Sequence, residues 1–121
     1  MKLLIALLSF ISLQVIAANG TETSYRYPSD LSEKETSTMI SYRDTYDACL
    51  QKEAKANVDK YEDFRKVADV AMESCKKTLS EIDNGLAEMK LDPDFRRYFL
   101  RKSSQKSSQQ LLNDLMQMKS K

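Results

Sequence analysis

Two segments that each contain one cysteine decide the fold: "TYDACLQKEA" (45–54) and "ADVAMESCKKTL" (68–79). In and around both, apolar residues recur at spacings of three and four, which is the pattern of a helix with one apolar face. The polar stretch "NVDKYED" (57–63) separates them. We therefore predict two helices joined by a turn, each with its cysteine on the apolar face.

The positions of Cys49 and Cys75 predict a disulfide between these helices. Their midpoint is position 62, inside the polar connection, and residues equidistant from the turn of an antiparallel helix pair face each other. Closing a loop of this length stabilises a fold by about 3.5 kcal/mol in the chain-entropy description. A redox-active pair usually needs C-x-x-C spacing, and a zinc site needs about four ligands in a chain that has no histidine. We therefore expect a structural disulfide rather than a redox or metal site.

The apolar spacing also predicts where the first helix lies. It extends from Met39 to Ala54, and Ser37 or Thr36 is the expected N-cap, because a hydroxyl there can accept a hydrogen bond from a free backbone N–H.

The second helix has the longest apolar period in the chain, from Phe64 to Met89. Gly85 weakens this helix, since glycine inside a helix costs about 1 kcal/mol relative to alanine. The apolar spacing continues across it, so we expect a continuous or slightly bent helix to about Lys90. An end at Asn84 is the alternative.

A third helix is predicted from "LDPDFRRYFL" (91–100), where Asp92 is a suitable N-cap and Pro93 suits the first helical position. The following "RKSSQKSSQQ" (101–110) has no apolar residue, so we expect it to stand in solvent or to form a looser helix. The predicted fold class is all-α: a disulfide-stapled antiparallel helical hairpin plus a third C-terminal helix.

The N-terminal sequence predicts export. Residues 1–17 combine Lys2, a short apolar run and small residues before the expected cleavage after Ala17 or Ala18, as in a secretory signal peptide. An uncleaved amphipathic or transmembrane helix is the alternative. Residues 18–35 have no sustained apolar period and are expected to form a flexible leader, and 36–121 a single small helical domain. We expect the protein in a bacterial periplasm or secreted, where cysteine pairs are oxidised.

Charge is unevenly distributed along the mature chain, with a balance of +6 over residues 96–121 and −6 over 18–95. The segment "FRRYFLRK" (95–102) alternates cations with aromatic residues. In the favoured interpretation its arginines pair with the acidic helices while Phe95 and Phe99 pack beneath them. In the alternative, the segment contacts anionic membrane lipids weakly. The cations concerned are Arg96, Arg97, Arg101 and Lys102.

The residue types argue against catalysis. The chain has no histidine, which removes the usual general base, and it has no glycine-rich phosphate loop. Several carboxylates are available, but their positions between apolar residues indicate a solvated helix face: Asp44, Asp47, Glu62, Asp63, Asp83 and Glu88. Four further residues follow helix spacing and are expected to pack in the core rather than to line a ligand pocket: Tyr42, Tyr46, Met72 and Met89. We expect no enzyme activity, no cofactor or metal, and no nucleic-acid partner.

The pattern "YDACLQKEA" (46–54) followed by "KVADVAMESCKKTL" (66–79) resembles a loose set of small, uncharacterised secreted or periplasmic bacterial proteins. In these, one helix carries Tyr-x-x-Cys and the next carries a short alanine-rich segment ending in cysteine. The resemblance implies a helical hairpin and an exported location, and it brings no activity or binding site. The residues that carry it are Tyr46, Cys49, Ala68, Ala71 and Cys75.

Together these features favour a non-enzymatic protein-interaction or envelope-associated module with an unknown protein partner. A membrane-surface protein that uses the basic C-terminal helix is the alternative. A carboxylate-dependent hydrolase is a remote third hypothesis.

Overall fold

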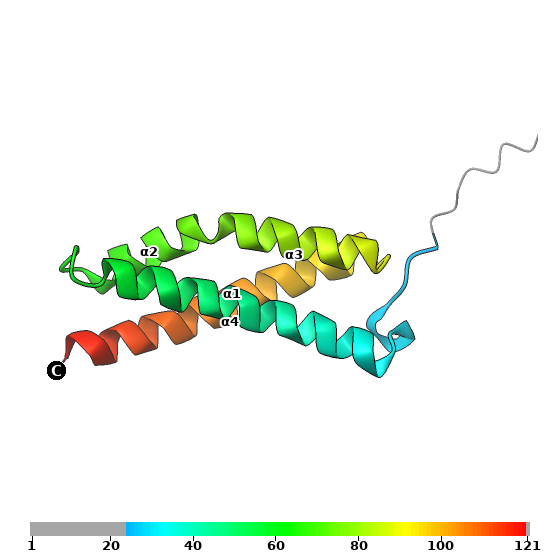
Figure 1. Cartoon of the computed structure of the whole chain (residues 1–121), viewed down its shortest axis with the longest axis horizontal. Coiled ribbons are helices and arrows are strands. Elements are labelled where there is room, and N and C mark those ends of the chain that lie inside the picture. The colour runs from blue at the N-terminus through cyan, green and yellow to red at the C-terminus, as the bar shows by residue number, and fades with distance from the viewer. Residues whose placement is uncertain (1–23, 121) are drawn as a thin grey trace, which may run out of the picture.

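The structure is a computed structural model that describes residues 24 to 120, so the expected signal peptide and residues 18 to 23 lie outside the described residues. Figure 1 shows an elongated bundle in which the α-helices lie lengthwise beside one another. Residues 24 to 120 contain four α-helices and no β-strand, which confirms the all-α class. The elements are the short 3-10 helix η1 (Pro28–Asp30), α1 (Glu33–Asn57), α2 (Phe64–Ser74), α3 (Lys76–Glu88) and α4 (Pro93–Lys119).

One apolar core lies where the helices meet. Helix α1 contacts each of the other three α-helices, and α4 contacts both α2 and α3. Full burial of an aliphatic side chain stabilises a fold by about 1.5–3 kcal/mol, so these contacts are the main source of stability. The largest fully buried side chains are those of Tyr46, Leu50, Val67, Cys75, Leu86, Leu91, Leu111 and Leu115.

The predicted disulfide is confirmed. Cys49 in α1 is bonded to Cys75, and their Cα atoms are 6.1 Å apart, within the usual range for a disulfide. Cys75 is fully buried in the core. The disulfide therefore links α1 to the junction between α2 and α3.

The second predicted helix consists of α2 and α3, which meet in a bend at Cys75. The backbone there has φ −97° and ψ 7°, away from helical values. Two backbone hydrogen bonds meet at the bend: Cys75 N–H donates to the Ala71 carbonyl (3.0 Å) at the end of α2, and Leu79 N–H donates to the Cys75 carbonyl (3.3 Å) at the start of α3. Helix α3 continues through Gly85, so the alternative end at Asn84 is wrong.

Helix α3 ends in a left-handed residue that is not glycine. Lys90 has φ 60°, and its N–H donates to the Ala87 carbonyl at 2.9 Å. Leu91 N–H donates to the Leu86 carbonyl at 3.3 Å, which completes a Schellman motif, and both leucines are buried in the core. The turn leads directly to Asp92, the confirmed N-cap of α4, whose carboxylate accepts hydrogen bonds from two backbone N–H groups.

Helix α1 begins earlier than the sequence predicted. Its N-cap is Ser32, not Thr36 or Ser37. The Ser32 hydroxyl accepts a hydrogen bond from Glu35 N–H, and the Glu35 carboxylate accepts one from Ser32 N–H, both at 3.1 Å. This reciprocal capping box explains a helix start that the apolar spacing did not reveal, since the first turn carries no apolar residue.

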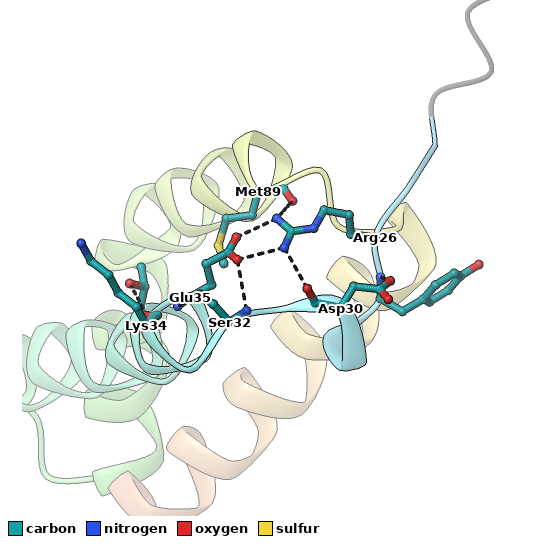
Figure 2. A network of polar contacts seen from close by, with 8 residues as sticks. Arg26, Asp30, Ser32, Lys34, Glu35 and Met89 are labelled. Carbon is teal, nitrogen blue, oxygen red and sulfur yellow. Dashed lines mark hydrogen bonds and ion pairs between the residues drawn. The ribbon is translucent and has the colours of Figure 1, made fainter.

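The expectation of a flexible leader up to residue 35 is wrong for residues 26 to 35, which are joined to the bundle or belong to α1 (Figure 2). The Arg26 guanidinium makes a forked ion pair with Glu35, with N–O distances of 2.7 and 2.9 Å. It also donates to the carbonyls of Asp30 (3.0 Å) and Met89 (3.4 Å). These bonds join the N-terminal segment to the start of α1 and the end of α3.

The Arg26 backbone adds a short parallel bridge to the α3–α4 turn. Its N–H donates to the Lys90 carbonyl at 2.8 Å, and its carbonyl accepts from Asp92 N–H at 3.0 Å. Hydrogen bonds from Arg26 and, next, from the Ser32 backbone lower the pKa of Glu35 to about 2. The carboxylate is therefore charged, and paired with Arg26, throughout the neutral and mildly acidic range.

The serine-rich stretch 101–110 is also packed more tightly than predicted. It lies inside α4, and Ser103 and Ser107 are only 3% and 5% exposed. With Phe99, Leu111 and Leu115 they form a buried row at intervals of four residues. The prediction that this stretch stands in solvent or forms a looser helix is therefore wrong, because small hydroxyl side chains fill the positions that face the other helices.

Candidate binding groove at the α2–α3 bend

A groove of about 440 Å³ lies beside the bend between α2 and α3. Met72 from α2 and Leu79 from α3 provide apolar wall, and Ser104 of α4 lies across from them. Tyr46 reaches the groove from α1 and, because it is only 1% exposed, forms its floor. Mostly apolar concavities of this size with a few polar groups are typical of ligand and peptide sites.

Three buried side-chain atoms among residues 24 to 120 have no hydrogen-bond partner: Arg43 Nε, Arg96 Nε and Ser103 Oγ. Tyr46 lines the groove although its side chain is almost completely buried in the core.

Charged residues form the rim of the groove. Glu73 and Lys76 make an ion pair with each other. Asp69 is exposed and has no ion pair within the described part of the chain. A neighbouring depression of about 350 Å³ shares Asp69 and Glu73 with the groove and adds Val70 to the apolar surface. The rim therefore presents one carboxylate that is not neutralised.

The basic and aromatic segment 95–102 is divided between core and surface. Phe99 is 6% exposed and packs in the core, and Phe95 packs against it with ring centroids 6.2 Å apart. Arg96 makes an ion pair with Asp83 of α3 at 3.1 Å, as the favoured interpretation expected. Arg97 pairs with Asp94 of its own helix.

The remaining cations of this segment are on the surface. Arg101 and Lys102 are exposed, and the Lys102 ammonium lies 5.9 Å from the ring centroid of Tyr98, which is 49% exposed. This leaves a smaller basic surface than the sequence suggested, because Arg96 is already paired and partly buried.

A second, polar depression lies between α1 and α4. The Ser107 hydroxyl donates to Asp47, and Gln51 donates to Asp114 at 3.0 Å. The Arg43 guanidinium stacks 5.9 Å from the ring centroid of Phe99. A depression of about 260 Å³ opens beside these contacts and is lined by Arg43, Asp44, Asp47, Lys106, Ser107 and Gln110.

Of the six carboxylates considered from the sequence, only Asp44 and Asp47 share a depression, the polar one between α1 and α4. Asp63 caps α2 and pairs with Arg65, whose hydrogen bonds lower the pKa of Asp63. Asp47 and Asp83 bind Ser107 and Arg96. Among residues 24 to 120, no three side chains of the metal-ligating types gather closely enough to bind an ion.

Sequence reasoning placed Tyr46 in the core and missed the groove above it. Tyr46 does pack in the core, and it also lines the groove. The groove combines residues from α1, α2, α3 and α4, so the spacing within one segment did not signal it. Met72, also expected to pack in the core, is partly buried and forms groove wall.

Comparison with known proteins returned no match, whether with protein families, curated proteins or solved structures. Within the described residues, every helix is too short or too polar to cross a lipid bilayer. The geometry of the groove is therefore the basis for the functional argument.

Proposed function

We propose that the protein is an exported, non-enzymatic helical module that binds a protein partner through the groove at the α2–α3 bend. The observation that carries this proposal is a groove of about 440 Å³ with apolar walls, whose rim carries the exposed carboxylate of Asp69. Mostly apolar concavities with a few polar groups at their edge are typical of binding sites. Met72 and Leu79 supply the apolar surface that would be removed from water on binding.

Export is supported by two independent features. The N-terminal sequence has the pattern of a signal peptide. Cys49 and Cys75, the two cysteines of the chain, are joined in a disulfide, and such bonds persist in oxidising compartments such as the periplasm or the cell exterior. The resemblance to small secreted or periplasmic bacterial proteins agrees with this location.

For the architecture, we propose that α1 and the α2–α3 pair form the disulfide-stapled antiparallel hairpin expected from the sequence. Two contacts support opposite directions. Cys49, in the second half of α1, is bonded to Cys75 at the start of α3, while Tyr42, nearer the start of α1, lies against Gly85 near the end of α3. The disulfide would then fix the bend, and with it the groove walls, relative to α1.

A second candidate function is binding to an anionic membrane surface through α4. It is favoured by the exposed Arg101 and Lys102 beside the half-exposed ring of Tyr98. The groove is the better candidate, because Phe95 and Phe99 face the core and do not add apolar surface that could enter a bilayer.

Site-specific photo-crosslinking tests the proposed function. A photoreactive benzoylphenylalanine would replace Lys76 on the groove rim and, as a matched control, Lys52, an exposed lysine of α1 that does not line the groove. In cells that produce the protein naturally, we expect one discrete adduct from position 76, absent from position 52 and lost on Met72→Glu. Equal adducts from both positions, or an adduct that Met72→Glu does not affect, would contradict the proposal.

A further inference from the structure

We propose that the polar depression between α1 and α4 is a second binding site, which takes a small zwitterion that carries an anionic group and an ammonium group a few atoms apart. A free α-amino acid is the simplest such ligand. The depression shares no lining residue with the groove at the α2–α3 bend, so this inference does not rest on the function proposed for the groove. It follows from an arginine without a partner, from the balance of charges and from the volume of the site.

Arg43 supplies the group that would hold the anion. Other arginines in the described part of the chain pair with carboxylates, namely Arg26, Arg65, Arg96 and Arg97. Arg43 makes no such pair there, and its enclosed Nε has no hydrogen-bond partner. The residue is only partly buried, and its guanidinium stacks 5.9 Å from the ring centroid of Phe99. A guanidinium held in this way offers a planar set of N–H donors, the geometry that matches a carboxylate or phosphate group.

The lining of the depression carries balanced charge. Arg43 and Lys106 are positive, Asp44 and Asp47 are negative, and the formal net charge is therefore zero. A ligand with one charge would be attracted by one pair of side chains and repelled by the other. A zwitterion can turn each of its charges toward the opposite sign, so it gains from both pairs.

Two of these charged side chains are available to a ligand. Lys106 and Asp44 are exposed, and neither belongs to an ion pair within residues 24 to 120. Asp47, in contrast, already accepts a hydrogen bond from Ser107. Asp44 is therefore the expected partner of the ligand's ammonium group, and Lys106 assists Arg43 in holding the anionic group.

The volume of the depression, about 260 Å³, favours a small ligand. Pockets for drug-sized molecules begin at about 300 Å³. A free amino acid with a short side chain is small enough, and so is the glycerophosphoethanolamine end of a zwitterionic lipid. These two sources share the chemistry that the site recognises, and the choice of probes separates them.

Two-dimensional NMR of the oxidised protein, followed at the Nε–Hε signal of Arg43, tests the inference. The probes are L-alanine, glycerophosphoethanolamine, propionate and ethylammonium, of which the last two each carry a single charge. We expect a zwitterion to shift the signal saturably and each single-charge probe to bind about tenfold more weakly, since it lacks one charge-assisted contact. Tighter binding of L-alanine would identify a free amino acid as the source, and tighter binding of glycerophosphoethanolamine a lipid headgroup. No saturable shift with either zwitterion, or equally tight binding of a single-charge probe, would overturn the inference.

Substitution of the exposed charges gives a second readout. Asp44→Asn should weaken the binding of L-alanine but strengthen that of propionate, because it removes the partner of the ammonium group and also the repulsion of the anion. Lys106→Gln should weaken both. The matched controls are Asp59→Asn and Lys52→Gln, at exposed residues outside the depression, which should change neither affinity.

A change of both affinities in the same direction on Asp44→Asn would overturn the assignment of the ammonium partner. Controls that acted as strongly as the depression variants would overturn the site itself. All four substitutions are at exposed residues, so their melting curves should match that of the parent and connect each change in affinity with the site rather than the fold.

Discussion

Tyr42 of α1 lies so close to Gly85 of α3 that a Cβ atom at residue 85 would be 2.8 Å from Cζ of the tyrosine ring. The glycine is therefore a packing residue in the last turn of α3, and it leaves room for the end of the Tyr42 side chain. Its helical φ is negative, so the constraint is the space available and not the backbone conformation.

Gly85→Ala should destabilise the fold, although alanine is the better helix former by about 1 kcal/mol. The tyrosine ring would have to move, and overpacking of this kind costs about 1–3 kcal/mol. Urea denaturation should show a lower free energy of unfolding for Gly85→Ala. In a Tyr42→Ala background the same substitution should instead be stabilising. A stabilising effect in both backgrounds would show that the close approach does not matter.

Phe99→Ala should lower the free energy of unfolding by about 3–5 kcal/mol, the usual cost of emptying a buried aromatic site. Phe99 is 6% exposed and its neighbour Tyr98 is 49% exposed, so Tyr98→Ala is a matched control expected to change stability by no more than about 0.5 kcal/mol. Thermal melts of the two variants provide the comparison. If Phe99→Ala melted like the parent, the assignment of this residue to the core would be refuted.

Ser103 and Ser107 occupy equivalent buried positions of α4 but should respond in opposite directions to replacement by alanine. The Ser103 hydroxyl is enclosed and has no hydrogen-bond partner among the described residues, so Ser103→Ala should be neutral or stabilising. The Ser107 hydroxyl donates to Asp47, so Ser107→Ala should cost about 1–2 kcal/mol by removing a donor from a partly buried carboxylate. Equal losses in urea denaturation would contradict this assignment.

The Arg26–Glu35 pair should make the attachment of the N-terminal segment sensitive to acid. The folded pKa of Glu35 is depressed, so the stabilisation is fully present above its ordinary value of 4.5 and is lost as the pH falls through about 2. NMR titration of the Glu35 carboxyl should give a midpoint near 2, shifted upward by Arg26→Gln. Lys34→Gln, which leaves the pair intact, should not shift it. A midpoint that does not respond to Arg26→Gln would contradict the ion pair as the main cause.

The features predicted correctly from the sequence are those set by local spacing. The Cys49–Cys75 disulfide follows from two apolar periods on either side of a polar turn. The start of α4 follows from Asp92 and Pro93, because an N-cap and a proline at the first position act within a few residues.

The features that were missed depend on residues far apart in the chain or on polar residues without an apolar period. Ser103 and Ser107 are buried because α4 continues the four-residue spacing of its larger side chains, which a search for apolar residues overlooks. Arg26 reaches partners at residues 35 and 89 that only the folded chain brings together. The groove needs Tyr46, Met72 and Ser104 from three different helices, so no single segment reveals it.

The most direct test of the account is photo-crosslinking from position 76 on the groove rim, compared with position 52 of α1. If the groove binds a protein partner, position 76 should give a discrete adduct that position 52 lacks and that Met72→Glu abolishes. Equal adducts from both positions, or an adduct that Met72→Glu does not affect, would contradict the proposed binding function.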